Sequence, residues 1–356
     1  MKKILIINKE QYGQHIDTYK YCKYLSNEYS VSYICFDQGH TKIKDYVNVY
    51  YISKSKNSFF STLIFINQVN KKIKKGNYDL IFVIYFSFCS IVRMINYSNN
   101  FLLDIRSSLL YNSYLKRKIF NYLLLFETYI YKDISIISTS LIQFLKLRKN
   151  NIHIVPLGAD KLSERKKDFT NIHLFYIGTL TFRNIHDTVY ALKEFIDEID
   201  DQNIKITYDI FGDGSKKYLD LLLRSIDETA LSEHVKFHGR KRHDEIQQYF
   251  DMCNLGVAYI PNTDFFDCQP PTKTFEYIGS GMVCLATCTS ENKLIINDTN
   301  GILCNDDRNS FKNALLEFYR KRDNYNSKDI QNTITNYDWK YIVSKFLKPV
   351  IYKILN

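Results

Sequence analysis

The sequence of 356 residues is poor in proline and glycine, with 5 and 12 residues, and has a single tryptophan. So few prolines and 45% hydrophobic residues exclude a disordered or collagen-like chain. The longest apolar run, residues 80–92, is too short to cross a membrane as a helix. A strand pattern follows Met1 almost at once, where a signal peptide would have a longer apolar segment. We therefore expect a soluble globular protein of about two domains.

The eight cysteines lack the spacing of a metal or redox site. They include no Cys-x-x-Cys pair, and no histidine cluster accompanies Cys284 and Cys288, which stand four positions apart. This pattern argues against a zinc ion and favours reduced thiols in the cytoplasm. The loop after the first strand pattern has one glycine, Gly13, where a dinucleotide-binding loop has three, which argues against a nicotinamide cofactor.

The positive charge is concentrated in the first half of the chain. Residues 1–160 contain 22 Lys and Arg against 10 Asp and Glu, a net charge of +12, and the remaining residues carry −2. A basic half of this kind is typical of proteins that meet anionic lipid or nucleic acid, and it also fits a lysine-rich face that keeps a protein soluble. No RNA-binding aromatic motif, zinc finger or basic repeat is present, so we expect no nucleic acid partner.

Strand and helix patterns alternate in both halves. The expected strands are 3–8, 31–36, 78–86, 100–105 and 134–138, then 173–177, 204–211, 235–238, 255–260 and 282–286. This order predicts an α/β protein of two Rossmann-like, doubly wound domains that face a central cleft. We expect one domain over 1–160 and a second over 161–336. A final helix, 337–356, returns to the first domain, with Trp339 packed against the protein.

Residues 114–132 have the pattern of a basic amphipathic helix. Lys116, Arg117 and Lys118 stand at its start, and apolar residues recur at positions 115, 119, 122, 123, 126 and 130. Such a helix can bury its apolar side in the core or lay it on a membrane. We expect the apolar side to belong to the core.

Residues 267–281 combine a helix start with two charged side chains. Pro270 and Pro271 suit the first positions of a short helix. Lys273 then falls in the first turn and Glu276 lies one turn deeper on the same face. A lysine near a helix N-terminus can bind phosphate, and a carboxylate can accept hydrogen bonds from a ribose diol. The same spacing fits a solvated surface ion pair, so spacing alone leaves both interpretations open.

The order of these segments resembles the retaining glycosyltransferases of family 4, which have the GT-B fold of two Rossmann-like domains. The likeness covers most of residues 100–320. Its segments are Asp104-Ile-Arg106, Val155-Pro-Leu-Gly-Ala-Asp160, Tyr176-Ile-Gly-Thr-Leu180 with Arg183, Ile210-Phe-Gly-Asp-Gly214, Val235-Lys-Phe-His-Gly239 and Pro271-Thr-Lys-Thr-Phe-Glu-Tyr-Ile-Gly-Ser-Gly281.

The resemblance implies a transferase whose co-substrate is a nucleotide-sugar and which needs no metal and no other cofactor. It implies that 1–160 is the acceptor-binding domain and that 161–336 is the nucleotide-sugar donor domain. The residues that would bind the donor diphosphate are Arg183, Lys273, Gly178 and Thr274. The residues that would border the nucleotide's base and ribose are Gly212, Gly239, Arg240 and Glu276. In this family, cationic side chains and a helix N-terminus neutralise the departing diphosphate.

The chain departs from the family pattern at two places. The family's first acid is expected eight residues before Glu276, where Cys268 stands, so we expect the adjacent Asp267 to contact the transferred sugar. In the first domain, Asp104 and Arg106 replace a His-Asp pair. Asp104 would orient the acceptor or support the leaving-group side, and Arg106 would bind an acceptor phosphate or form a structural salt bridge. Gly13 would also lie on the acceptor side.

We therefore expect a cytoplasmic hexosyl- or related glycosyltransferase that acts with retention in bacterial surface polysaccharide biosynthesis. Its acceptor would be a saccharide or a polyprenyl-diphosphate-linked saccharide. Its basic half would hold it peripherally on an anionic membrane surface at the inner face. The alternative is a non-catalytic sugar-nucleotide or polyanion-binding protein with the same fold, because the first acid is replaced.

Overall fold

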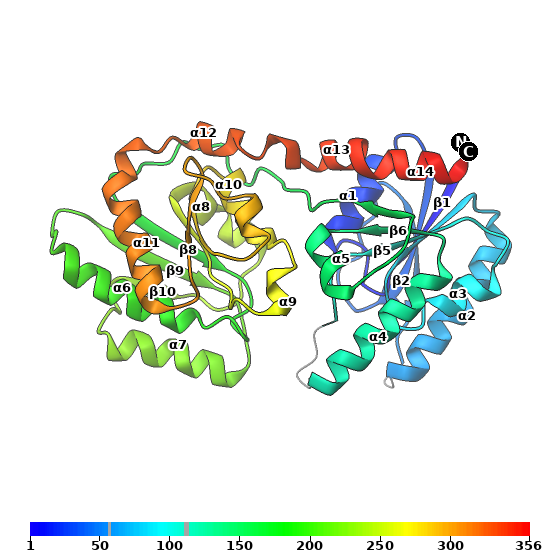
Figure 1. The fold of residues 1–356 in the computed structure, drawn as a ribbon, viewed down its shortest axis with the longest axis horizontal. Helices are drawn as coiled ribbons and strands as arrows, with labels where there is room; N and C mark the ends of the chain where they lie inside the picture. The colour runs from blue at the N-terminus through cyan, green and yellow to red at the C-terminus, as the bar shows by residue number, and fades with distance from the viewer. Residues whose placement is uncertain (56–57, 110–113) are drawn as a thin grey trace. The chain divides into compact units, whose positions relative to one another are not determined.

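The computed structural model describes residues 1–55, 58–109 and 114–356. It divides into two compact units, each built on one parallel sheet (Figure 1). Unit 1 comprises Met1–Gly158 and Trp339–Asn356, and unit 2 comprises Ala159–Asp338. The predicted α/β fold class of two doubly wound sheets is confirmed.

The sheet of unit 1 has seven strands in the order β3-β2-β1-β4-β5-β6-β7. The strands are β1 (Lys3–Ile7), β2 (Ser30–Asp37), β3 (Asn48–Ser53), β4 (Leu80–Ile84), β5 (Phe101–Ile105), β6 (Asp133–Ile136) and β7 (Ile152–Ile154). The helices are α1 (Ile16–Leu25), α2 (Ser58–Gly76), α3 (Ser90–Ile95), α4 (Tyr114–Ile130), α5 (Thr139–Leu145), α13 (Trp339–Ile342), a π-helical turn (Val343–Leu347) and α14 (Lys348–Leu355). The central strands are buried along their length because helices cover both faces of the sheet.

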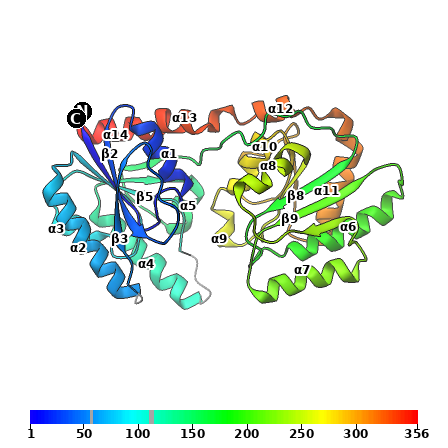
Figure 2. The ribbon, with the colours of Figure 1, turned by 180° about the vertical axis from the view of Figure 1, so that it is seen from behind.

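The sheet of unit 2 has six strands in the order β10-β9-β8-β11-β12-β13. The strands are β8 (Ile172–Ile177), β9 (Ile206–Phe211), β10 (Val235–Phe237), β11 (Leu255–Ala258), β12 (Val283–Thr287) and β13 (Gly301–Cys304). The helices are α6 (Ile185–Ile199), α7 (Lys216–Glu228), α8 (His243–Met252), α9 (Asp264–Asp267), α10 (Thr272–Gly279), α11 (Arg308–Lys321) and α12 (Ser327–Asn332), with 3-10 turns at Asn292–Leu294, Arg322–Asn324 and Thr335–Tyr337. The view from behind shows helices on both faces of this sheet (Figure 2).

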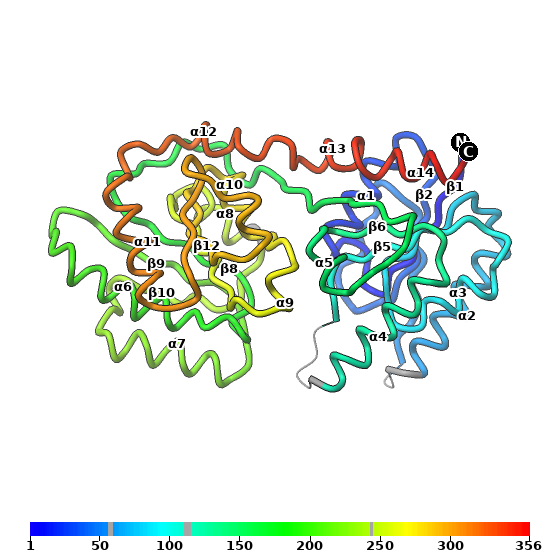
Figure 3. The backbone as a smooth tube through the Cα atoms, viewed as in Figure 1, coloured from blue at the N-terminus to red at the C-terminus, as the bar shows by residue number. Residues whose placement is uncertain are grey.

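The C-terminal segment returns to unit 1, as expected. Trp339 is buried, and its ring packs edge-on against Tyr21 of α1 at a centroid distance of 6.0 Å. Lys348 pairs with Glu28 at 2.5 Å, and α14 ends beside the start of β1 (Figure 3). The two ends of the chain thus belong to one unit.

The prediction for the apolar side of α4 is wrong. Leu115, Ile119, Tyr122 and Phe126 are all at least half exposed, although they carry the amphipathic pattern. The side of α4 that packs on the unit contains the fully buried Leu124 and Glu127. The pattern correctly indicates an amphipathic helix, but the apolar stripe faces outwards.

Gly212 lies where two loops at the carboxyl edge of the unit 2 sheet touch. Its φ is +140°, and a Cβ added there would stand 1.8 Å from the carbonyl oxygen of Gly178. Gly239, after the next strand, has φ +67° but no heavy atom within 4 Å of an added Cβ. Both positions favour glycine for backbone reasons, but only Gly212 is also held by contact.

We predict that Gly212→Ala lowers the free energy of unfolding by about 4 kcal/mol or more, because strain and steric overlap add. Gly239→Ala should lower the free energy of unfolding by only about 1–2 kcal/mol, because the backbone there is left-handed. Thermal and urea unfolding of the two variants measures the difference. Equal losses would contradict the close contact between the two loops.

Candidate functional site

Three predicted site glycines lie side by side at the carboxyl edge of the unit 2 sheet. Gly178, Gly212 and Gly239 directly follow β8 and β9 and closely follow β10, which are neighbours in the sheet. The N–H of Gly178 donates to the carbonyl of Phe211 at 3.1 Å, and the N–H of Gly212 donates to the carbonyl of Gly239 at 2.9 Å. This edge is where open α/β sheets bind ligands.

Arg183 lies in the loop between β8 and α6. Its guanidinium carbon stands 4.1 Å from the ring centroid of Phe266, which belongs to α9. Within the ranges that the structure describes, no carboxylate forms an ion pair with it. Burial lowers the pKa of Arg183, but an arginine remains charged at neutral pH. A half-buried cation without a compensating anion is suited to bind one.

The backbone around Arg183 is strained and held in place. Its neighbours Phe182 and Asn184 have φ +60° and +51°, which are uncommon for residues with a side chain. The same loop is tied to the loop after β9, because the N–H of Leu180 donates to the carbonyl of Asp213 at 2.7 Å. Strain of this kind persists where the surroundings hold a residue in place, often at functional sites.

Lys273 and Glu276 lie on one face of α10, as their spacing predicts. The Nζ atom of Lys273 is 2.6 Å from Oε2 of Glu276, with the side chains 33% and 25% exposed. The N–H of Ile177, the last residue of β8, donates to the Tyr277 hydroxyl at 3.1 Å. This bond places α10 beside the end of β8. Lys273 lies four residues before Tyr277 on the same face of α10, so we infer that it lies near the loop after β8 that carries Arg183.

The other predicted residues near α10 are engaged in contacts within the unit. Thr274 is fully buried, and its hydroxyl donates to Oδ1 of Asn292 at 2.8 Å. Both carboxylate oxygens of Asp267 accept hydrogen bonds from Ser290, at 2.7 Å from its N–H and 2.6 Å from its hydroxyl. Cys268 is buried, and this burial raises the pKa of its thiol to about 12. Asp267 therefore holds the loop after β12.

The loop after β10 contains one predicted side chain and one that the sequence patterns missed. Arg240 is exposed and lies 3.3 Å from Asp213. The sequence patterns predict no function for His238, although it belongs to the segment that ends in Gly239. Its ring stacks on Phe211 at a centroid distance of 4.3 Å, and its Nε2 lies 2.7 Å from Oδ1 of Asp209. The sequence feature that could have identified His238 is its position directly before Gly239, at the end of a predicted strand.

In unit 1, Asp104 and Arg106 form a buried cluster with Asp17. Nε of Arg106 donates to Oδ2 of Asp17 at 2.6 Å, and Nη1 donates to the carbonyl of Val155 at 2.6 Å. Asp104 is fully buried and accepts from the hydroxyl of Ser135 at 2.6 Å. This geometry is that of the structural salt bridge that the sequence left open.

Gly13 lies between β1 and α1 with φ +90°. It belongs to the same loop region as His15, which caps α1 by accepting from the N–H of Thr18. The loop stands at the carboxyl end of β1, at the edge where β5 also ends, because all strands of this sheet are parallel. Its part in acceptor binding remains a prediction.

Comparison with known proteins gives a fold and no family. No family model and no curated protein matches the sequence. Among solved structures, sucrose-phosphate synthase from Thermosynechococcus elongatus aligns over 100% of this chain and 99% of its own, with TM-score 0.75 and 13% identity. HepE from Anabaena, in complex with UDP and glucose, aligns over 99% and 100%, with TM-score 0.75 and 15% identity. The lipopolysaccharide outer core galactosyltransferase WaaB aligns over 99% of both, with TM-score 0.71 and 14% identity.

The chain has the GT-B fold. The similarity extends over essentially the full length of each chain, so both sheets take part in it. At 13–15% identity, this similarity supports the GT-B fold alone. The chemistry of the site must be argued from its own residues.

The described residues offer neither a metal site nor a membrane-spanning helix. Across residues 1–55, 58–109 and 114–356, no group of three or more His, Cys, Asp or Glu side chains is placed to hold a metal ion. None of the helices in the described part of the chain is long and apolar enough to cross a membrane.

The buried cluster in unit 1 predicts a pH dependence of stability. Burial raises the pKa of Asp104 from 3.8 to about 6, although Arg106 and Ser135 oppose this effect. Between these two values the folded state binds more protons than the unfolded state, so this contribution to stability falls as the pH rises. Asp104→Asn removes the titrating group. The stability of the wild type relative to Asp104→Asn should therefore be highest near pH 4 and lower at pH 7, as measured by urea unfolding. A difference that stays constant would contradict the raised pKa.

Proposed function

We propose that the protein is a glycosyltransferase that binds a nucleotide diphosphate-sugar at the carboxyl edge of the unit 2 sheet. The observation that carries the proposal is that the loop with Arg183 leaves the end of β8 and that α10, which carries Lys273, is bonded to the same strand end. Arg183 has no carboxylate partner in the described part of the chain, and Lys273 stands in the first turn of α10. Two cations and a helix N-terminus suit a diphosphate.

The solved structures with this fold support a nucleotide-sugar as the donor. HepE was solved with UDP and glucose, and WaaB is described as a galactosyltransferase. Glu276, one turn below Lys273, is the side chain that would accept hydrogen bonds from the ribose. In the structure it pairs with Lys273, and a bound phosphate would compete with the carboxylate for this lysine. Gly212 and Gly239 bring bare backbone close to the base.

The positive charges of Arg183 and Lys273 define the chemistry that the protein would supply. As the bond between sugar and diphosphate breaks, negative charge grows on the departing diphosphate. Fixed cations near this charge stabilise the transition state more than the ground state. We therefore propose that the reaction needs no divalent metal. Retention of the anomeric configuration and membership of family 4 belong to the same proposal and rest on the resemblance of the motifs.

The acceptor is proposed from charge. Residues 1–160 carry a net charge of +12. This charge suits a saccharide acceptor linked to a polyprenyl diphosphate, presented at an anionic membrane surface on the cytoplasmic side. The similarity to a lipopolysaccharide galactosyltransferase agrees with a role in bacterial surface polysaccharide biosynthesis.

One observation favours a second candidate, a sugar-nucleotide-binding protein without catalysis. Cys268 stands at the position of the expected acid and is buried, and Asp267 beside it binds Ser290 with both carboxylate oxygens. The contacts of Asp267 and the burial of Cys268 do not direct either side chain toward a ligand. A protein of this kind would bind the donor and leave it intact.

We predict that UDP stabilises the wild type against thermal unfolding and that Arg183→Ala and Lys273→Ala weaken this binding. Loss of a hydrogen bond to a charged group costs about 1.5–3 kcal/mol, which corresponds to about ten- to a hundredfold in Kd. The matched control is Lys321→Ala, because Lys321 forms a similar helical pair with Glu317 at 2.7 Å on α11. Equal stabilisation of all four proteins by UDP would contradict the proposed site.

Slow hydrolysis of the donor separates the two candidates. A transferase should release nucleoside diphosphate from its nucleotide-sugar in the absence of acceptor, and Lys273→Ala should abolish the release. We expect the rate to persist in the presence of EDTA, because the two cations take the role of the metal. Binding of the donor without release, across a panel of nucleotide-sugars, would support the non-catalytic candidate.

A further inference from the structure

The outer face of α4 carries a continuous apolar stripe, which we call the α4 stripe. Its members are Leu115, Ile119, Tyr122, Phe126 and Tyr129, and they are 65%, 55%, 60%, 64% and 56% exposed. Steps of four and three residues keep them on one side of the helix over its whole length. A contiguous exposed apolar stripe marks an interaction surface.

A buried carboxylate fixes the outward orientation of the stripe. Glu127, on the opposite side of α4, is fully buried. It accepts hydrogen bonds from the N–H and hydroxyl of Ser90 at 2.9 and 2.8 Å, from the N–H of Phe88 at 3.1 Å and from the hydroxyl of Tyr85 at 3.1 Å. Rotation of the helix to bury the stripe would break all four bonds and leave a charge unpaired. The exposed stripe is therefore a fixed feature of the fold.

The charges around the stripe have one sign. The helices α2, α3 and α4 contact one another in this order and lie together in both ribbon views (Figures 1 and 2). Their only acidic residue is the buried Glu127. Further exposed apolar side chains on them are Phe60, Leu63, Ile64, Met94 and Ile95. Their cationic residues are Lys71, Lys72, Lys74, Lys75, Arg93, Lys116, Arg117 and Lys118.

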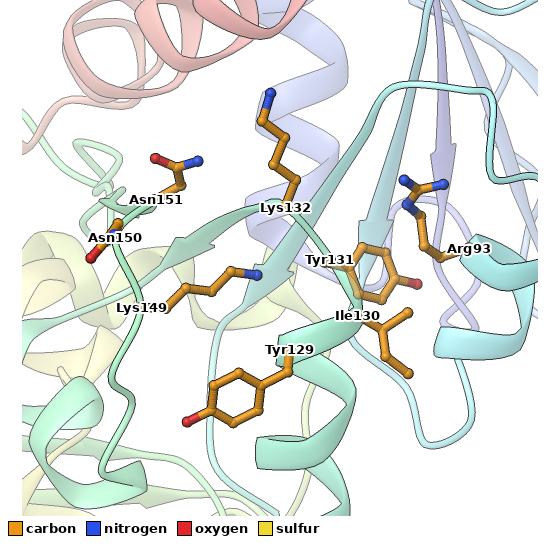
Figure 4. A pocket seen from close by; sticks show the side chains of 8 residues that line it. All are labelled: Arg93, Tyr129, Ile130, Tyr131, Lys132, Lys149, Asn150 and Asn151. Atoms are coloured by element: carbon orange, nitrogen blue, oxygen red, sulfur yellow. The ribbon is translucent and has the colours of Figure 1, made fainter.

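A cationic pocket lies at the end of the stripe. It has a volume of about 400 Å³, and Tyr129 at the end of the stripe lines it together with Arg93, Lys132 and Lys149 (Figure 4). No acidic side chain lines it. Arg93 and Lys149 donate hydrogen bonds to backbone carbonyls, those of Tyr97 and Thr128, and the nearby Asp133 compensates part of the charge of Lys149. The pocket suits a phosphate group.

We propose that α4, supported by α2 and α3, lies on an anionic membrane with the α4 stripe in the interfacial region and a lipid phosphate in the pocket. An amphipathic helix with apolar and cationic exposed side chains binds such surfaces in this manner. A second copy of the chain would bring like charges together. Nucleic acid would match the cations but would leave the aliphatic part of the stripe in water. The proposal names the surface that would hold the protein at the membrane. It rests on the proposed function only for the reason to bind there, which is a lipid-linked acceptor.

The test is co-sedimentation of the full chain with vesicles of phosphatidylcholine, with and without phosphatidylglycerol. We expect the wild type to bind the anionic vesicles at low salt. The double variant Ile119→Ser, Phe126→Ser should bind at least tenfold more weakly. Lys118→Gln should weaken binding less and reduce its dependence on salt. The control is Leu223→Ser, because Leu223 is 47% exposed on α7 of unit 2.

Three outcomes would overturn the proposal. They are equal binding of the double variant and the wild type, equal binding to vesicles with and without the anionic lipid, and a dimer in solution that only the double variant loses. The substituted side chains are exposed, so the variant should melt like the wild type. It should also keep its stabilisation by UDP, which separates loss of docking from failure of the proposed donor site.

A tryptophan reporter tests the depth of the stripe. The chain has one tryptophan, Trp339, which is buried and gives a constant background. Phe126→Trp should shift its emission to shorter wavelength when anionic vesicles are added, because the ring enters the apolar region. Leu223→Trp should show no shift. An unchanged spectrum of Phe126→Trp would contradict insertion of the stripe.

Discussion

All paired strands in both sheets run parallel, and the rest of the structure depends on this constraint. Parallel strands require crossover connections, so every strand of one sheet ends at the same edge. In unit 2 this edge collects the glycines after β8, β9 and β10 and the segment that leads from β11 into α10. The loop that carries Arg183 and the helix that carries Lys273, although distant in sequence, therefore meet at one strand end. The bond from Ile177 to Tyr277 and the packing of the Tyr277 ring on Phe175 of β8, at a centroid distance of 5.8 Å, hold α10 beside this strand.

The edge of unit 2 is also where the backbone departs most from ordinary geometry. Gly212 has a backbone conformation and a neighbour that exclude a side chain, and Phe182 and Asn184 hold left-handed conformations on either side of Arg183. Such positions reduce stability, so the rest of the unit must fix them. The connection between the two loops, through Leu180 and Asp213, does this. The result is a firmly held loop around Arg183, so the proposed binding of a diphosphate would need little reorganisation.

Local patterns predicted the elements well, and contacts between distant residues decided what the patterns could not. The i, i+3 spacing of Lys273 and Glu276 and the helix start at Pro271 depend on a few neighbouring residues, so the sequence was sufficient for them. Asp104 and Arg106 were correctly expected at the end of a strand, but Asp17, which binds Arg106, is 89 residues away. The edge strand β3 was missed because none of its residues is buried, so it does not have the pattern of a buried strand that identified its neighbours.

The same limit explains the wrong orientation predicted for α4. An amphipathic pattern shows that apolar residues share a side, and the usual choice places that side in the core because burial contributes about 1.5–3 kcal/mol for each large side chain. In this helix the opposite side holds Glu127, whose four hydrogen bonds reach residues about 40 positions earlier. Rotation of the helix would leave the carboxylate of Glu127 and its four donors without these partners, so the hydrogen bonds hold the observed orientation. This orientation of α4 leaves five large apolar side chains in water, and docking on a membrane would remove that cost in free energy.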